Sequence, residues 1–181
     1  MASWVQRVIG AAKLDAATYE DVEADKSATG QALGVVVLSS IAAGIGGLAA
    51  GERGVLGGLV AGLAGWVAAS FLTYVIGAKM LPEPQTRADM GEMLRTLGFA
   101  AAPGFLRAFG FLPLFGGIIV LAAQVWMLFA TVVAVRQALD YTSTGRAVLV
   151  CVIGWFVNLL LWVWIAALVG IAFVGLGAMG Q

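Results

Sequence analysis

Long apolar stretches separated by short polar segments form the dominant pattern of this sequence. Five of them occur, near residues 31–50, 55–77, 93–112, 114–135 and 147–174. An α-helix needs about 20 apolar residues to cross a hydrocarbon core of about 30 Å, and each stretch has about that length or more. The last stretch, about 42 Å long at 1.5 Å per residue, must tilt or extend beyond the lipid. The pattern predicts an all-α, polytopic membrane protein whose five transmembrane helices form a bundle.

Residues 1–30 follow a different pattern. Apolar residues recur at helical spacing from Trp4 to Ala12, which favours a short amphipathic helix in the membrane interface, and a frayed tail is the alternative. Asp15 can begin a second helix whose acidic residues either form a solvated face or bind cations or a basic partner. We therefore expect a short N-terminal cytoplasmic or interfacial helical segment, followed by a five-helix transmembrane domain over residues 31–181.

The basic residues predict the orientation. Eight of the ten Lys and Arg residues lie in the N-terminal segment and in the second and fourth loops between spans. Cytoplasmic loops carry an excess of Lys and Arg. We therefore expect a multi-pass protein with its N-terminus in the cytoplasm and its C-terminus outside, in the inner or plasma membrane if the source is a bacterium.

The amino-acid composition excludes several kinds of partner and cofactor. The chain is 61% hydrophobic and 11% charged, against about 25% charged residues in soluble domains. Its net charge of zero argues against nucleic acid as a partner. With no histidine and only Cys151 as a thiol, it can form neither an internal disulfide nor a histidine-ligated haem or zinc site. We expect no metal and no cofactor.

The third stretch departs most from a plain membrane helix, because it contains both Pro103 and Arg107. Proline leaves the carbonyl of Phe99 without its helical hydrogen bond and tends to kink a helix. Arg107 lies about 18 Å along the axis from Arg95. From there its side chain can extend to the outer headgroups or cap a helix end. The functional alternatives are binding of a lipid phosphate, or an ion pair with Glu52 of the first outer loop.

Other polar residues inside the spans are uncharged. Gln124 and Asn158 lie near the middles of the fourth and fifth stretches, so they either contact each other between helices or line a solute path. The five spans contain no Asp, Glu, Lys or His, and no carboxylate pair or catalytic triad can therefore form at membrane depth. The sequence predicts a non-enzymatic protein with no catalytic residue.

Glycines surround the first outer turn. Gly47 and Gly51, and then Gly54, Gly58 and Gly62, follow the small-xxx-small spacing. Such spacing lets two helix backbones approach closely. We expect the first two spans to form a tight antiparallel hairpin, and a pore lining or a homodimer interface is the alternative.

Three segments suggest a family. The run GFAAAP at residues 98–103 resembles the G-Y-x-x-x-P element in the third helix of Yip1-domain proteins. Residues 14–32 are similar to the entry into the first helix of bacterial members, and residues 143–147 resemble the lead into their last helix. The resemblance implies a Yip1-like five-helix membrane domain, with Gly98 and Pro103 setting the geometry of the third helix.

The resemblance does not extend to the Rab GTPases that eukaryotic members bind at Golgi and endoplasmic reticulum membranes. Phe99 replaces the tyrosine of the element, and the N-terminal segment lacks the acidic aromatic motif of those proteins. We expect a membrane-organising, scaffold or accessory subunit that contacts the lipid bilayer and a membrane-protein partner or a second copy of itself. The alternative is a passive channel or small-solute transporter.

Overall fold

The computed structural model describes residues 2–48 and 54–179, and this part of the chain contains helices and no β-strand. In chain order its elements are α1 (Trp4–Ala12), α2 (Ala16–Ala24), α3 (Ala28–Gly47), α4 (Val55–Thr73), η2 (Tyr74–Met80), α5 (Met90–Phe99), η3 (Ala102–Phe111), α6 (Gly116–Ala138) and α7 (Thr144–Met179). The segment η2 is π-helical, and η3 is a 3₁₀ helix. The predicted all-α class is confirmed.

Four helices of the described part are long and apolar enough to cross a membrane. They are Ala28–Gly47, Val55–Met80, Gly116–Ala138 and Thr144–Leu161. These correspond to the first, second, fourth and fifth predicted spans, so the prediction of a multi-pass helical membrane protein is confirmed. The third predicted span, 93–112, is not among them.

That third span is divided into two elements instead of forming one kinked helix. α5 ends at Phe99, and Pro103 lies in the first turn of η3. Proline has no N–H to donate to the carbonyl four residues earlier, which removes one hydrogen bond that would continue α5. The expectation that residues 93–112 form one continuous helix was therefore wrong. The predicted count of five spans is thus approximate, since four helices of the described part meet the length and hydropathy of a span.

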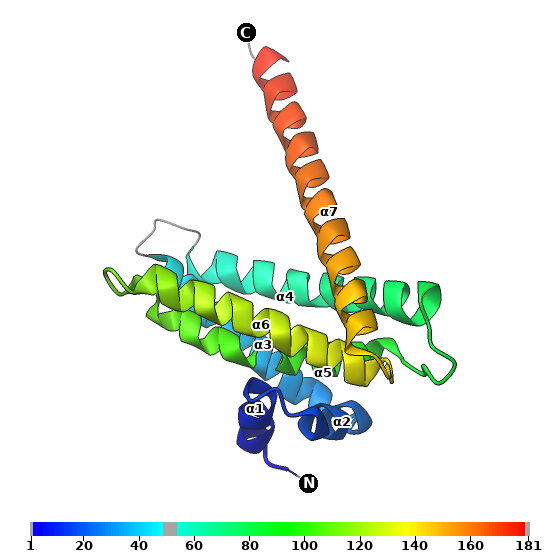
Figure 1. Cartoon of the computed structure of the whole chain (residues 1–181). Helices are drawn as coiled ribbons and strands as arrows, with labels where there is room; N and C mark the ends of the chain where they lie inside the picture. The colour runs from blue at the N-terminus through cyan, green and yellow to red at the C-terminus, as the bar shows by residue number, and fades with distance from the viewer. Residues whose placement is uncertain (1, 49–53, 180–181) are drawn as a thin grey trace.

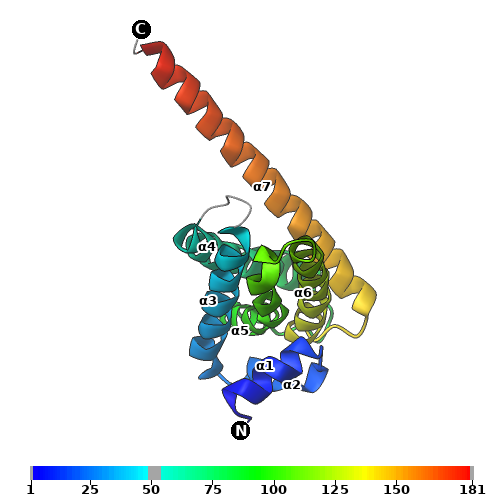
Figure 2. The same ribbon diagram turned by 90° about the vertical axis from the view of Figure 1, so that its left-hand side faces the viewer.

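The broken segment lies inside the bundle. α3 and α4 lie side by side, and α6 runs along the other side of the α5–η3 segment. α7 leaves this group at a steep angle, and α1 and α2 lie on the opposite side (Figures 1 and 2). η3 fits between α3 and α6, because Gly110 faces both Gly46 of α3 and Val120 of α6. A Cβ on Gly110 would stand 3.1 Å from the Cα of Gly46 and 2.9 Å from the nearest methyl carbon of Val120.

The first hairpin is tight within one chain. A Cβ on Gly44 would stand 2.7 Å from the Cα of Val55, and one on Gly58 would stand 3.3 Å from the Cα of Gly44. A Cβ on Gly62 would overlap the hydroxyl of Ser40. Glycine therefore permits close packing of α3 and α4, as predicted for Gly58 and Gly62, whereas a Cβ on Gly54 would meet nothing within 4 Å. Gly51, at the predicted turn, lies outside the described residues.

The N-terminal helices are joined to each other and to the start of α3 by Arg7. Its side chain is only 2% exposed, its Nε and Nη2 lie 2.8 Å from carboxylate oxygens of Asp21 and Asp25, and its Nη1 donates to Gln31 at 3.1 Å. Hydrogen bonds from Ser27 and then from Arg7 lower the pKa of Asp25 to about 2. Residues 4–12 thus form an anchored helix, and the alternative of a frayed tail does not hold.

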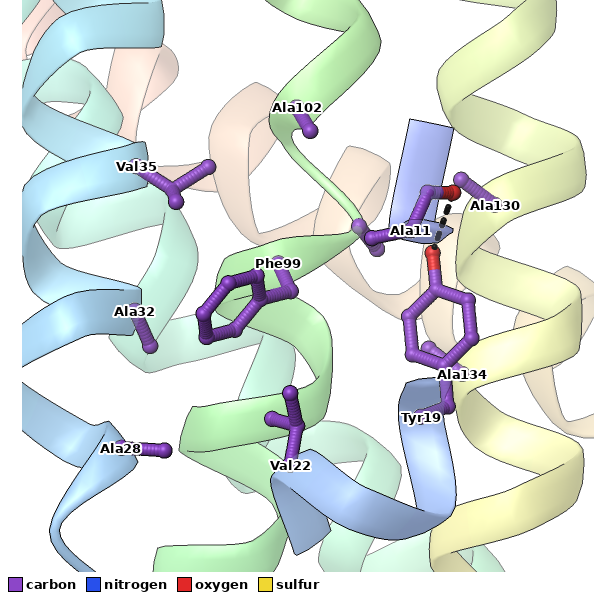
Figure 3. Close-up of a cluster of buried hydrophobic side chains, with 11 residues drawn as sticks. Ala11, Tyr19, Val22, Ala28, Ala32, Val35, Phe99, Ala102, Ala130 and Ala134 are labelled. Carbon is purple, nitrogen blue, oxygen red and sulfur yellow. Dashed lines mark hydrogen bonds between the residues drawn. The ribbon is translucent and has the colours of Figure 1, made fainter. Parts of the chain in front are cut away.

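Packing continues from the N-terminal helices into the membrane bundle. Tyr19 and Val22 of α2 share one buried cluster with Phe99 of α5 and Ala130 of α6. Figure 3 shows Phe99 between α3 and the N-terminal helices, with the Tyr19 hydroxyl donating to the carbonyl of Ala11 at 3.1 Å. The first thirty residues therefore contribute to the same core as the spanning helices.

Candidate functional site

Arg107 lies in η3, and its guanidinium points into the bundle. Nη2 donates to the carbonyl of Ser39 at 3.0 Å and to its hydroxyl at 2.8 Å, and Nε donates to the carbonyl of Gly104 at 3.2 Å. The backbone carbonyl of Arg107 faces Gly46, near the end of α3. Its guanidinium reaches Ser39, which precedes Gly46 by seven residues and lies about 10 Å nearer the middle of that helix. The expected extension toward the outer headgroups was wrong, because Ser39 and Gly104 supply acceptors inside.

Two cavities adjoin this guanidinium. One, of about 390 Å³, is also lined by Gly46, Gly110, Gly117 and Gln124. The other has a volume of about 240 Å³, and its lining includes Ser39, Ser40, Trp66 and Thr131. Among the described residues, no carboxylate forms an ion pair with Arg107, and Nη1 donates no hydrogen bond. The positive charge is therefore held by neutral oxygens at the edge of an open space.

The predicted contact between Gln124 and Asn158 is not formed. Gln124 lines the cavity of about 390 Å³, whereas Asn158 lines a third cavity of about 150 Å³ together with Thr73 and Cys151. Thr131 lines both this third cavity and the one beside Ser39. The polar residues of the spans thus border three neighbouring cavities instead of pairing directly.

The remaining predicted residues are structural or lie outside the described part. A Cβ on Gly98 would stand 2.8 Å from that of Ala32, so glycine allows α5 to pack closely on α3. Phe99 is fully buried, and Pro103 is buried in the first turn of η3. Glu52, the predicted partner of Arg107, lies outside the described residues, and that ion pair remains a prediction.

Sequence reasoning missed a polar cleft at the end of the bundle nearest α2. The cleft has a volume of about 650 Å³, and its charged lining residues are Glu20, Glu23, Glu92, Arg136 and Asp140. They come from α2, α5, α6 and the loop after α6, so no local spacing in the sequence brings them together. Acidic residues in α2 were the only signal available.

Arg95 of α5 holds the backbone of Glu23, one of the residues that line this cleft. It is 4% exposed, and its Nε and Nη2 donate to the backbone carbonyl of Glu23 at 3.2 and 2.6 Å. The Glu23 side chain is half-buried, and this burial raises its pKa to about 7, with repulsion from Asp140, Glu92 and Glu20 acting in the same direction. Glu23 is therefore a carboxyl that changes charge near neutral pH.

Glu23 makes stability depend on pH. Its pKa is about 7 when folded and about 4.5 when free, so the folded chain binds more protons than the unfolded chain between these pH values. The free energy of unfolding therefore falls as pH rises through this range.

We expect Glu23→Gln to raise the unfolding temperature at about pH 8 and to leave it unchanged below about pH 5. Thermal unfolding in detergent at both pH values measures this difference. Lys26→Gln, an exposed charge deletion near the end of α2, is the control, and equal pH profiles for wild type and Glu23→Gln would contradict the assignment.

The geometry defines an all-helical, multi-pass membrane protein with a broken α5–η3 segment packed inside its bundle. The family model of the Yip1 domain matches residues 15–165, from the start of α2 into α7. The chain therefore belongs to the Yip1 family, as the run GFAAAP and its neighbouring segments predicted. No curated protein and no solved structure matches the chain.

Proposed function

We propose that this Yip1-family protein is a non-enzymatic membrane-organising or accessory subunit that acts through contacts with lipids and with a partner membrane protein or a second copy of itself. The observation that carries the proposal is the folded N-terminal pair α1–α2, which is fixed to the spanning helices. Proteins of the Yip1 family are generally non-enzymatic membrane proteins.

Polar contacts of Arg7, Arg95 and Trp126 help to fix this pair. Arg7 joins α1 to α2 and to α3. Arg95 of α5 holds the end of α2, and Trp126 of α6 donates to the carbonyl of Ala12 at 2.8 Å. A surface that is already ordered loses less conformational freedom when a partner binds. The α1–α2 pair therefore offers a preformed contact surface outside the spanning helices, on the cytoplasmic side if the basic residues predict the orientation correctly.

Crosslinking tests the partner contact. A photoactivatable amino acid replaces Ala17, which is exposed in α2, or Leu121, which is 65% exposed on the apolar face of α6. Cells are irradiated, and the tagged chain is purified in mild detergent. We expect the Ala17 probe to give one discrete adduct with a partner or a second copy, and the Leu121 probe to give mainly lipid adducts. Absence of any protein adduct at Ala17 would count against the organising role.

A passive channel or small-solute transporter is the second candidate. It is favoured by the chain of three cavities, because Arg107 lines the first two and Thr131 lines the last two. Purified protein in liposomes tests it through ion flux and the release of small dyes. Liposomes that pass no ion and no solute would exclude this role and leave the organising role as proposed.

A further inference from the structure

We propose that Arg107 binds a phosphate group in the cavity of about 390 Å³ that it forms with Gly46, Gly110, Gly117 and Gln124. The group is the phosphodiester of a phospholipid or a free phosphate anion. The inference rests on the proposed function, because it names the chemistry of one of the lipid contacts through which the protein acts.

The first argument is the unused donor capacity of the guanidinium. Arginine carries five N–H donors. Nε and Nη2 of Arg107 donate to Gly104 and Ser39, so the two N–H groups of Nη1 remain without an acceptor among the described residues. Carbonyl and hydroxyl oxygens satisfy hydrogen bonds but leave the net charge uncompensated. A positive charge in a membrane segment is costly unless it meets water or an anion, and the fork of a guanidinium matches phosphate oxygens.

The second argument is the position of the cavity. Its walls include Gly46 and Gly47 at the end of α3 and Gly117 at the start of α6, so the cavity begins at the end of the bundle. From Gly117 it extends to Gln124, about 10 Å along α6. A headgroup at the membrane surface can therefore place its phosphate within reach of a side chain that is directed into the protein.

The third argument is the lining. A Cβ on Gly117 would meet nothing within 4 Å, so its lack of a side chain leaves part of the space open. Gln124 supplies a carboxamide whose NH₂ can donate to a second phosphate oxygen. Beside it on α6, Ile118, Leu121 and Val125 are 65%, 65% and 43% exposed. These side chains form an apolar surface along which acyl chains can lie.

The experiment compares wild type with two variants that change the site differently. Arg107→Gln removes the charge, whereas Gly117→Leu keeps Arg107 and fills the cavity. Gly34→Leu, at another position with nothing within 4 Å of its Cβ, is the control for adding bulk. In one arm each protein is reconstituted in phosphatidylglycerol vesicles and extracted in mild detergent, and the phospholipid retained per chain is measured by native mass spectrometry. In the other arm, phospholipid-free protein in detergent is titrated with inorganic phosphate.

We expect wild type and Gly34→Leu to retain a phospholipid, and both site variants to lose at least tenfold in retention. Binding of inorganic phosphate with the same dependence on Arg107 and Gly117, without lipid retention, would identify the free anion as the source. The proposal is overturned if wild type binds neither probe or if Gly117→Leu binds like wild type. Partner crosslinking at Ala17 does not depend on these outcomes, so the two proposals can fail separately.

Discussion

Gly46→Ala is expected to lower the free energy of unfolding by about 3 kcal/mol, the upper part of the usual range for adding a methyl group to a close-packed site. The new Cβ would overlap the backbone carbonyl oxygen of Arg107 and stand 3.1 Å from its carbonyl carbon and 3.3 Å from the Cα of Gly110. A side chain could rotate away from such a contact, but these are backbone atoms. The pairing of α3 with η3 would therefore have to open.

The matched control for this prediction lies in the same helix. A Cβ on Gly34 of α3 meets nothing within 4 Å, so Gly34→Ala should be neutral or should stabilise the helix by up to about 1 kcal/mol. Both variants can be unfolded by sodium dodecyl sulfate in mixed micelles while circular dichroism and tryptophan fluorescence are recorded. If Gly46→Ala were as stable as Gly34→Ala, the close approach of α3 and η3 would be wrong.

Arg7→Ala is expected to produce the second-largest loss, about 2 kcal/mol. Removing one member of a buried ion pair usually costs about 3–5 kcal/mol, because the other charge is left buried. Here Asp21 is 43% exposed and Asp25 is 17% exposed, so water can solvate part of the abandoned charge and reduce the cost. The loss should fall mainly on α1, which would detach from α2 and α3.

Two measurements test the role of Arg7. Lys13→Ala removes a basic residue that is exposed immediately after α1, and it should change stability little. Hydrogen exchange should show faster exchange in α1 for Arg7→Ala while α6 remains protected. Equal stability losses for Arg7→Ala and Lys13→Ala would show that the contacts of Arg7 with Asp21, Asp25 and Gln31 stabilise the protein no more than an exposed charge does.

Hydropathy predicted the spanning helices because each is a continuous apolar run. The predicted span 31–50 corresponds to α3, Ala28–Gly47, and 114–135 corresponds to α6, Gly116–Ala138. The division of the third segment into an α-helix and a 3₁₀ helix could not be predicted in the same way. Pro103 indicated an interruption, but the 3₁₀ conformation of η3 occurs where the segment packs between α3 and α6, and that packing depends on residues distant in sequence.

The same distinction applies to the candidate site. Arg107 was recognisable as an arginine in an apolar stretch, but its direction depends on Ser39, which lies 68 residues earlier. The role of Arg7 was missed because an arginine on a short amphipathic helix looks like an exposed residue until α2 folds against it. Sequence reasoning therefore found which residues were unusual, and the packing determined which partners they have.

The anchoring of α1 and α2 has a consequence for the order of events during synthesis. Ala12 binds Trp126, which lies 114 residues later, and Glu20 accepts a hydrogen bond from Gln137, 117 residues later. At about 5–20 residues per second, roughly 6 to 23 seconds pass between the synthesis of these helices and that of their partners in α6. The first helices can thus join the start of α3 early through Arg7 and Gln31, but their contacts with α6 form only after α6 has been made.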